Sequence, residues 1–221
     1  MTSKRTKIII GIFVVLASIF IVFRMICAYC IVFITAQAEE AMEEGDYEKA
    51  VDKLLLSQKF LFEGETSEKN SALLADCYYE LEMYAEAIKN YQDALNENCS
   101  ECGAVYYNNI GVSYANLGEY EKALEYYSNA LELKPDYAEV CSSIGALYIR
   151  LEQPDMSIQY FERAIELDPD FAITYGNCAY AYAQMGDFDK AYEYLQKSIE
   201  HDYDNAEALY NLIEEMEYYY E

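Results

Sequence analysis

The sequence predicts an all-α protein in which pairs of helices repeat along the chain and stack into a solenoid, behind one long apolar N-terminal helix. Three observations favour this class. Tyrosine, glycine and alanine recur at the same offsets about every 34 residues. Within each recurrence the large apolar residues follow the period of a helix, not that of a strand. Residues 8–23 carry no charged side chain, which indicates a helix that enters a membrane.

The N-terminal part divides into a basic tail, residues 1–7, and a transmembrane signal anchor, residues 8–34, that runs on into the first repeat helix. Arg24 is its single charged residue, and a long Arg side chain can reach the headgroups near the end of a span. The alternative is a cleaved signal peptide, because Ala36-Gln37-Ala38 resembles a cleavage site. Such peptides have shorter apolar regions, and cleavage there would remove the first repeat helix. We therefore expect an uncleaved anchor.

Charge predicts the orientation and excludes one class of partner. Residues 1–34 hold four basic and no acidic residues, whereas residues 35–221 hold eleven basic and 40 acidic ones. The positive-inside rule places the N-terminus in the cytoplasm and the acidic domain outside it, in a single-pass protein. Nucleic acid is excluded as a partner, since phosphate binding needs clustered Lys and Arg. An acidic surface favours basic or neutral partners, and it also serves solubility.

The clearest helix pair occupies residues 104–137. Its first helix places large residues on one face, Gly118 ends that helix, and Pro135 closes the unit. The face residues of the two helices are Tyr107, Ile110, Gly111 and Tyr114, then Tyr120, Ala123, Tyr127 and Ala130. The same landmarks place further pairs at about 31–64, 68–101, 138–171 and 172–205. The repeat domain covers residues 35–221, and its first helix begins in the apolar segment before it. Residues 206–221 then form a capping helix that covers the last apolar face.

These offsets resemble the tetratricopeptide repeat, a helix–turn–helix with the pattern W-x2-L-G-x2-Y…A-x3-F…P. Tyr107 stands at the usual Trp position and Tyr127 at the Phe position. The resemblance implies a curved stack whose first helices line a concave groove. It implies as groove residues Asp76, Tyr79, Asn108, Val112, Asn116, Ser142, Arg150, Asn177 and Tyr180. Family members that clamp a C-terminal carboxylate use Lys, Asn and Arg there. This chain has Asn108 in place of Lys in the third repeat and Asp76 in the second, and Arg150 is the one cation on this surface, so we do not expect that mode.

Chemistry other than binding has weak support in the sequence. The single histidine, His201, lies in a turn, and no phosphate-binding loop, nucleophile elbow or H-E-x-x-H motif occurs. Two C-x-x-C pairs are present, Cys27–Cys30 and Cys99–Cys102. They leave open a small disulfide at Cys99 and Cys102, lipidation of Cys27 and Cys30, or less readily a zinc site. We predict no enzyme activity, no cofactor and no metal.

The sequence thus predicts a membrane-anchored scaffold that docks a peptide or helix of a protein partner, one that is basic or neutral with apolar anchors. Similar anchored repeat proteins suggest a role in envelope protein assembly or secretion. The alternatives are an organellar import receptor whose repeat domain faces the cytosol, and a regulatory subunit of an enzyme. The terminal run Tyr218-Tyr219-Tyr220 is a second candidate contact patch.

Overall fold

The computed structural model describes residues 4–61, 68–96, 102–201 and 203–220, and every regular element in these ranges is a helix. The chain divides into two compact units, Met1–Cys99 and Ser100–Glu221, which we describe separately. The helices of the first unit are α1 (Lys4–Glu43), α2 (Tyr47–Gln58), α3 (Glu68–Glu80) and α4 (Tyr84–Asn96). Those of the second are α5 (Gly103–Asn116), α6 (Tyr120–Leu133), α7 (Ala138–Arg150), α8 (Pro154–Leu167), α9 (Ala172–Gln184), α10 (Phe188–Glu200) and α11 (Ala206–Tyr220).

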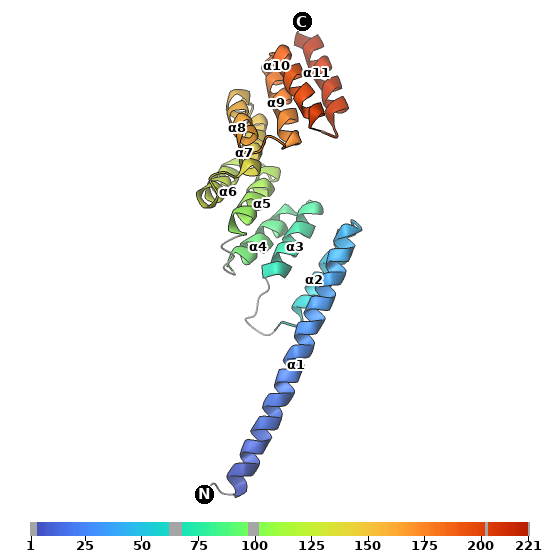
Figure 1. The fold of residues 1–221 in the computed structure, drawn as a ribbon, viewed down its shortest axis with the longest axis vertical. Helices are drawn as coiled ribbons and strands as arrows, with labels where there is room; N and C mark the ends of the chain where they lie inside the picture. The colour runs from blue at the N-terminus through green and yellow to red at the C-terminus, as the bar shows by residue number, and fades with distance from the viewer. Residues whose placement is uncertain (1–3, 62–67, 97–101, 202, 221) are drawn as a thin grey trace. The chain divides into compact units, whose positions relative to one another are not determined.

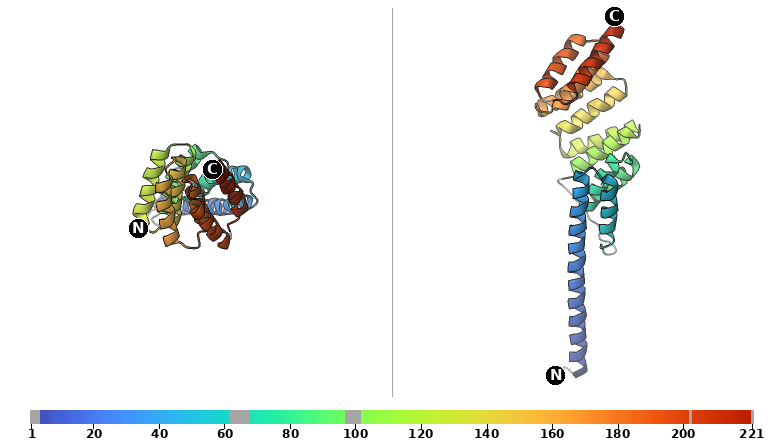
Figure 2. Two further views of the ribbon diagram at one scale, coloured as in Figure 1. Left: turned by 90° about the horizontal axis from the view of Figure 1, so that it is seen from above. Right: turned by 90° about the vertical axis from the view of Figure 1, so that its right-hand side faces the viewer.

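Helix α1 is unbroken over 40 residues and serves two different environments (Figure 1). Its apolar side chains from Ile12 to Phe33 are mostly exposed, whereas Ala38 and Ala41 are fully buried against the rest of the unit. The stretch Gly11–Glu43 contains 18 consecutive residues with a mean hydropathy of 2.5 and is long and apolar enough to cross a membrane. Helix α2 returns beside α1, as the right-hand view of Figure 2 shows.

The core of the first unit forms where α1, α2 and α3 meet. Apolar side chains from the three helices pack there: Ala38, Ala41, Ala50, Leu54, Leu74 and Cys77. Three buried polar side chains form a hydrogen-bonded series across the same interface. The Thr35 hydroxyl donates to Asn70 Oδ1 at 3.0 Å, and the Asn70 amide donates to the Ser57 hydroxyl. Since buried polar groups cost free energy unless they are paired, these bonds favour one alignment of the three helices.

The second unit is a stack of helical hairpins closed by α11 (Figure 1). Glycine allows close contact inside the hairpins: a Cβ on Gly111 would lie 2.6 Å from Tyr127 Cε1, and one on Gly145 would lie 2.5 Å from Phe161 Cε1. Tyr127 and Phe161 are almost completely buried as a result. Ile213 of α11 has no exposed surface and packs against the core of α9 and α10. Helix α11 therefore covers the apolar end of the stack.

The turn inside each hairpin has the same left-handed residue at its centre. Three of these residues are glycines with φ of 77°, namely Gly45, Gly118 and Gly186. At the corresponding positions of the other two hairpins stand Glu82, with φ of 59°, and Glu152, with φ of 57°. Glycine adopts this conformation without a steric penalty, whereas a residue with a Cβ does not. The backbone keeps the turn geometry even where the sequence lacks glycine.

Candidate functional site

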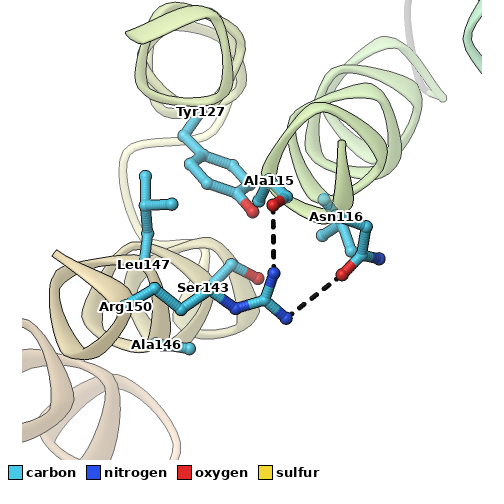
Figure 3. Close-up of a pocket in the computed structure, with 8 residues that line it drawn as sticks. Ala115, Asn116, Tyr127, Ser143, Ala146, Leu147 and Arg150 are labelled. Atoms are coloured by element: carbon cyan, nitrogen blue, oxygen red, sulfur yellow. Dashed lines mark hydrogen bonds between the residues drawn. The ribbon is translucent and has the colours of Figure 1, made fainter. Parts of the chain in front are cut away.

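A cleft opens between α5 and α7 in the second unit, with a volume of ≈ 110 Å³ (Figure 3). Its apolar floor comes from three helices, because Tyr127 of α6 reaches between the other two. Three residues on its wall, Val112, Asn116 and Arg150, belong to the predicted groove. The full lining consists of Val112, Ala115, Asn116, Tyr127, Ser143, Ala146, Leu147 and Arg150.

Arg150 bridges the two sides of this cleft. It is the last residue of α7, and its guanidinium donates to the carbonyl oxygen of Ala115 at 3.0 Å and to Asn116 Oδ1 at 3.1 Å (Figure 3). The last carbonyls of a helix lack partners within the helix, and a cation near them is favourable. Arg150 therefore caps the C-terminal end of α5. These bonds use two of the five N–H donors of a guanidinium.

A second hollow of ≈ 290 Å³ lies between α9 and α11. Two predicted groove residues, Asn177 and Tyr180, line it together with the exposed Leu212. The Tyr203 ring forms one wall by lying against Gly176, where a Cβ would be 2.7 Å from Tyr203 Cε1. Sequence reasoning missed the contribution of α11, although the apolar spacing of that helix and the replacement of Pro by Tyr203 are visible in the sequence. The lining consists of Gly176, Asn177, Tyr180, Tyr203, Asn205, Ala208, Leu209 and Leu212.

Two predicted groove residues offer little surface to a ligand. Ser142 is only 6 % exposed, and its hydroxyl is 3.2 Å from the Thr174 hydroxyl, which donates to it. Its neighbour Ser143 lines the cleft instead. Asn108 is half-buried, and its Oδ1 atom has no surface exposed and no hydrogen-bond partner. Both residues occupy the same position in their repeats, which faces the next first helix in the stack.

The two groove residues of the first unit lie close to α4. Asp76 is half-buried and accepts a hydrogen bond from the Tyr91 hydroxyl at 2.5 Å. Burial raises the pKa of the Asp76 carboxyl, and the bond from Tyr91 opposes this effect. Tyr79 lies edge-on to Tyr84, with ring centroids 5.6 Å apart. The Asp76 side chain is thus partly exposed, and it is hydrogen-bonded to Tyr91 of α4, the second helix of its own pair.

The residues considered for other chemistry have structural surroundings of their own. The His201 ring stacks on Tyr175, with centroids 4.8 Å apart, and its Nδ1 is 3.7 Å from an Asp170 carboxylate oxygen. Cys102 is half-buried, whereas Cys99, the other cysteine of this C-x-x-C pair, lies outside the described residues, so the disulfide left open by the sequence falls outside them too. In the described ranges no three His, Cys, Asp or Glu side chains lie close enough to hold a metal ion. The linings of the two hollows consist of apolar and uncharged polar residues together with Arg150.

Comparison with protein families settles the family. Profiles of the tetratricopeptide repeat match residues 73–98, 104–137, 138–171, 160–193 and 177–214. The chain belongs to the tetratricopeptide repeat family. The solved structure of TTC0263, a thermophilic repeat protein of this family from Thermus thermophilus, has a TM-score of 0.66 and 19 % sequence identity. The likeness covers 84 % of this chain and 98 % of that one, so the all-α repeat fold is shared.

Curated relatives match over shorter stretches. The mitochondrial import receptor subunit TOM70 of Saccharomyces cerevisiae is 34 % identical over 87 residues, which is 38 % of this chain and 14 % of the relative. The photosystem I assembly protein Ycf3 of Rippkaea orientalis is 44 % identical over 54 residues, 24 % of this chain and 31 % of the relative. The chain spans about 14–15 % of the length of the first curated relatives it matches. Proteins of this repeat family bind other proteins, and this chain is a protein-interaction scaffold.

Proposed function

We propose that this chain is a membrane-anchored scaffold that docks an extended or helical segment of a protein partner along the first helices of its repeats. The cleft between α5 and α7 is the observation that carries the proposal. It combines an apolar floor of Tyr127 and Leu147 with hydrogen-bonding groups of Asn116 and Arg150 at its rim. This is the composition of a site that accepts an apolar side chain and pairs with the backbone next to it.

A photocrosslinking experiment in intact cells tests the site. A photoreactive amino acid at Ala146, which lines the cleft, should attach to a partner that mass spectrometry can identify. The matched control carries the same group at Ser128, which is exposed on the second helix α6. Equal products from both positions, or products from Ser128 alone, would show that the cleft is not where the partner binds.

We also propose that α1 keeps this scaffold in a membrane. Its exposed apolar stretch supports the anchor, and so does the packing of its C-terminal part. Cleavage after Ala38 would remove Thr35 and Ala38, which are buried in the first unit. The full chain should therefore stay in the membrane pellet after an alkaline carbonate wash. A soluble product that begins at Glu39 would contradict the anchor.

An import receptor is the second candidate, and the similarity to TOM70 over 87 residues favours it. The two candidates differ in orientation. The basic residues at the start of α1, Lys4, Arg5 and Lys7, predict an extracytoplasmic repeat domain, whereas an import receptor needs this domain in the cytosol. Protease treatment of intact cells or organelles, followed by detection of a C-terminal tag, separates them. In intact cells, digestion supports an extracytoplasmic repeat domain at the cell surface, and protection supports a cytosolic one. In intact organelles, digestion supports a repeat domain that faces the cytosol, as an import receptor requires.

A further inference from the structure

The exposed apolar surface of α1 is longer than a bilayer core requires. Exposed apolar residues continue from Ile12 to Phe33, and the uncharged sequence begins at Ile8. A helix of residues 8–33 is about 39 Å long, whereas the hydrocarbon core is about 30 Å thick. If the core begins after the basic tail, it ends near Cys27, where α1 first becomes buried. Residues Tyr29–Phe33 then extend beyond it.

Helix α2 brings a second exposed apolar surface to the same level. The Lys53 ammonium donates to Gln37 Oε1 at 2.8 Å, which fixes the antiparallel register of α2 against α1. Leu56 is one turn further along α2 and therefore lies level with residues 33–34 of α1. Leu55 and Leu56 are 41 % and 40 % exposed. An exposed apolar pair at the end of a helix thus lies beside the surplus apolar stretch of α1.

The residues of α1 at this level are those that prefer a membrane–water boundary. Tyr29 and Phe33 are one helical turn apart, and their rings stack with centroids 6.4 Å apart. Tyr29 is 71 % exposed. Aromatic rings, and Tyr in particular, gather at the headgroup level because one end is apolar and the other can hydrogen-bond. Lys59, exposed at the end of α2, adds a cation that phosphate groups attract.

We propose that Tyr29, Val32, Phe33, Leu55 and Leu56 form a membrane-facing patch that lies in the interfacial region of the bilayer crossed by α1. The occupant of the patch is phospholipid, because the patch continues the exposed apolar surface of the span without a charged residue between Arg24 and Glu39. The proposal rests on the membrane anchor proposed above. Its consequence is that the membrane holds the first helix pair at two places. One is the span of α1 itself, and the other is the end of α2, which rests on the membrane surface.

The chain contains no tryptophan, so a single introduced Trp reports on its own surroundings. The probe is Leu56→Trp in the full chain, reconstituted at low protein-to-lipid ratio in vesicles of phosphatidylcholine with brominated acyl chains. Met83→Trp is the matched control, because Met83 is also 40 % exposed in the same unit. Asn70 contacts Ser57 next to Leu56. Helix α3 then runs about 15 Å from Asn70 to Glu80, and Met83 lies in the turn beyond its end. Phe23→Trp reports on the span itself.

Bromine should reduce the fluorescence of Phe23→Trp and Leu56→Trp roughly twofold or more, because both rings lie within the bilayer or its interface. Met83→Trp should keep its intensity. Quenching of Phe23→Trp without quenching of Leu56→Trp would overturn the patch and leave the anchor intact. The absence of quenching at Phe23→Trp would overturn both. Leu55→Trp repeats the test if Leu56→Trp does not fold. A Trp at position 55 or 56 whose emission is blue-shifted but not quenched by bromine would assign the patch to a protein contact, and this result would also overturn the proposal.

Discussion

At the scale of single residues, the α5–α6 and α7–α8 hairpins depend on contact between a glycine and an aromatic ring. Gly111→Leu should lower the free energy of unfolding by about 1–3 kcal/mol, because even a Cβ would lie 2.6 Å from Tyr127 Cε1. Urea unfolding of the full chain in detergent, followed by circular dichroism, measures the effect.

Two controls accompany the Gly111 variant. Ser128→Leu places the same side chain on the exposed face of α6 and should change stability little. In a Tyr127→Ala background the ring is absent, so Gly111→Leu should cost much less than it does alone. Additive effects of the two substitutions would mean that Gly111 and Tyr127 do not compete for the same space.

The turn residue Glu152 offers a test with the opposite sign. Its φ of 57° is unfavourable for a residue with a Cβ. Glu152→Gly should therefore stabilise the second unit by up to about 1 kcal/mol, after the greater flexibility of glycine in the unfolded chain is subtracted. Glu125→Gly, at an exposed interior position of α6, should destabilise by about the amount typical of glycine in a helix. Melting temperatures that fall for both variants would contradict the assignment of strain to Glu152.

Residue positions within the helices were predictable where the pattern itself carried the information. The helical spacing around Gly111 and Tyr127 predicted both the helices and the face they bury. The burial of Ser142, which we expected to line the groove, was not predictable in this way. It depends on the neighbouring repeat, where Thr174 supplies a hydrogen-bond partner, and the equivalent contact in the first unit joins Thr35 to Asn70. The Arg150 bridge likewise depends on the carbonyl of Ala115 in the preceding repeat.

At the scale of helices, tyrosines of α9 and α10 donate hydrogen bonds to carboxylates of neighbouring helices: Tyr182 to Glu162 of α8, and Tyr192 to Glu217 of α11. Burial, together with Glu162, raises the pKa of Tyr182 to about 12. Burial and a hydrogen bond to Glu217, 2.9 Å long, raise the pKa of Tyr192 to about 12. Ionised tyrosine is therefore disfavoured in the folded state relative to the unfolded one, where the pKa is about 10.

The direction of the pH dependence follows from these raised values. Below a pH of about 10 both tyrosines are neutral in the folded and unfolded states, so their contribution to the free energy of unfolding is fully present. Between about 10 and 12 the unfolded state loses protons more readily, and stability falls as pH rises. Tyr182→Phe and Tyr192→Phe should each flatten this alkaline loss, measured as the melting temperature against pH. Tyr218→Phe, at a 76 % exposed tyrosine near the end of α11, is the control. An unchanged slope for all three variants would contradict a role for these hydroxyls.

At the scale of the whole molecule, charge and surface shape select different properties of a partner. Acidic residues outnumber basic ones by 29 in residues 35–221. The described linings of the two hollows contain one charged residue, Arg150, and are otherwise neutral. Long-range attraction should thus favour a basic partner, whereas the contact surface itself should accept apolar and uncharged groups. The acidic excess was plain in the sequence, but the neutral lining required the fold.

The binding prediction combines these two properties. A partner identified by crosslinking at Ala146 should bind more weakly as salt rises, because salt screens the attraction between its basic residues and the acidic scaffold. Asn116→Ala together with Tyr180→Ala should weaken binding by about tenfold, or ~1.4 kcal/mol, since one polar group is lost from the rim of each hollow. Titration at two salt concentrations, by isothermal calorimetry, separates the two effects.

The controls for this titration lie on the second helices. Gln159→Ala with Gln196→Ala changes exposed residues of α8 and α10 and should leave affinity unchanged. The Asn116 and Tyr180 double variant should retain the circular dichroism spectrum of the wild type, because both side chains are only half-buried. If it binds as tightly as the wild type at both salt concentrations, the first helices do not form the site. The exposed tyrosines Tyr218 and Tyr219 at the end of α11 would then be the next surface to substitute, because they are 76 % exposed and lie outside both hollows.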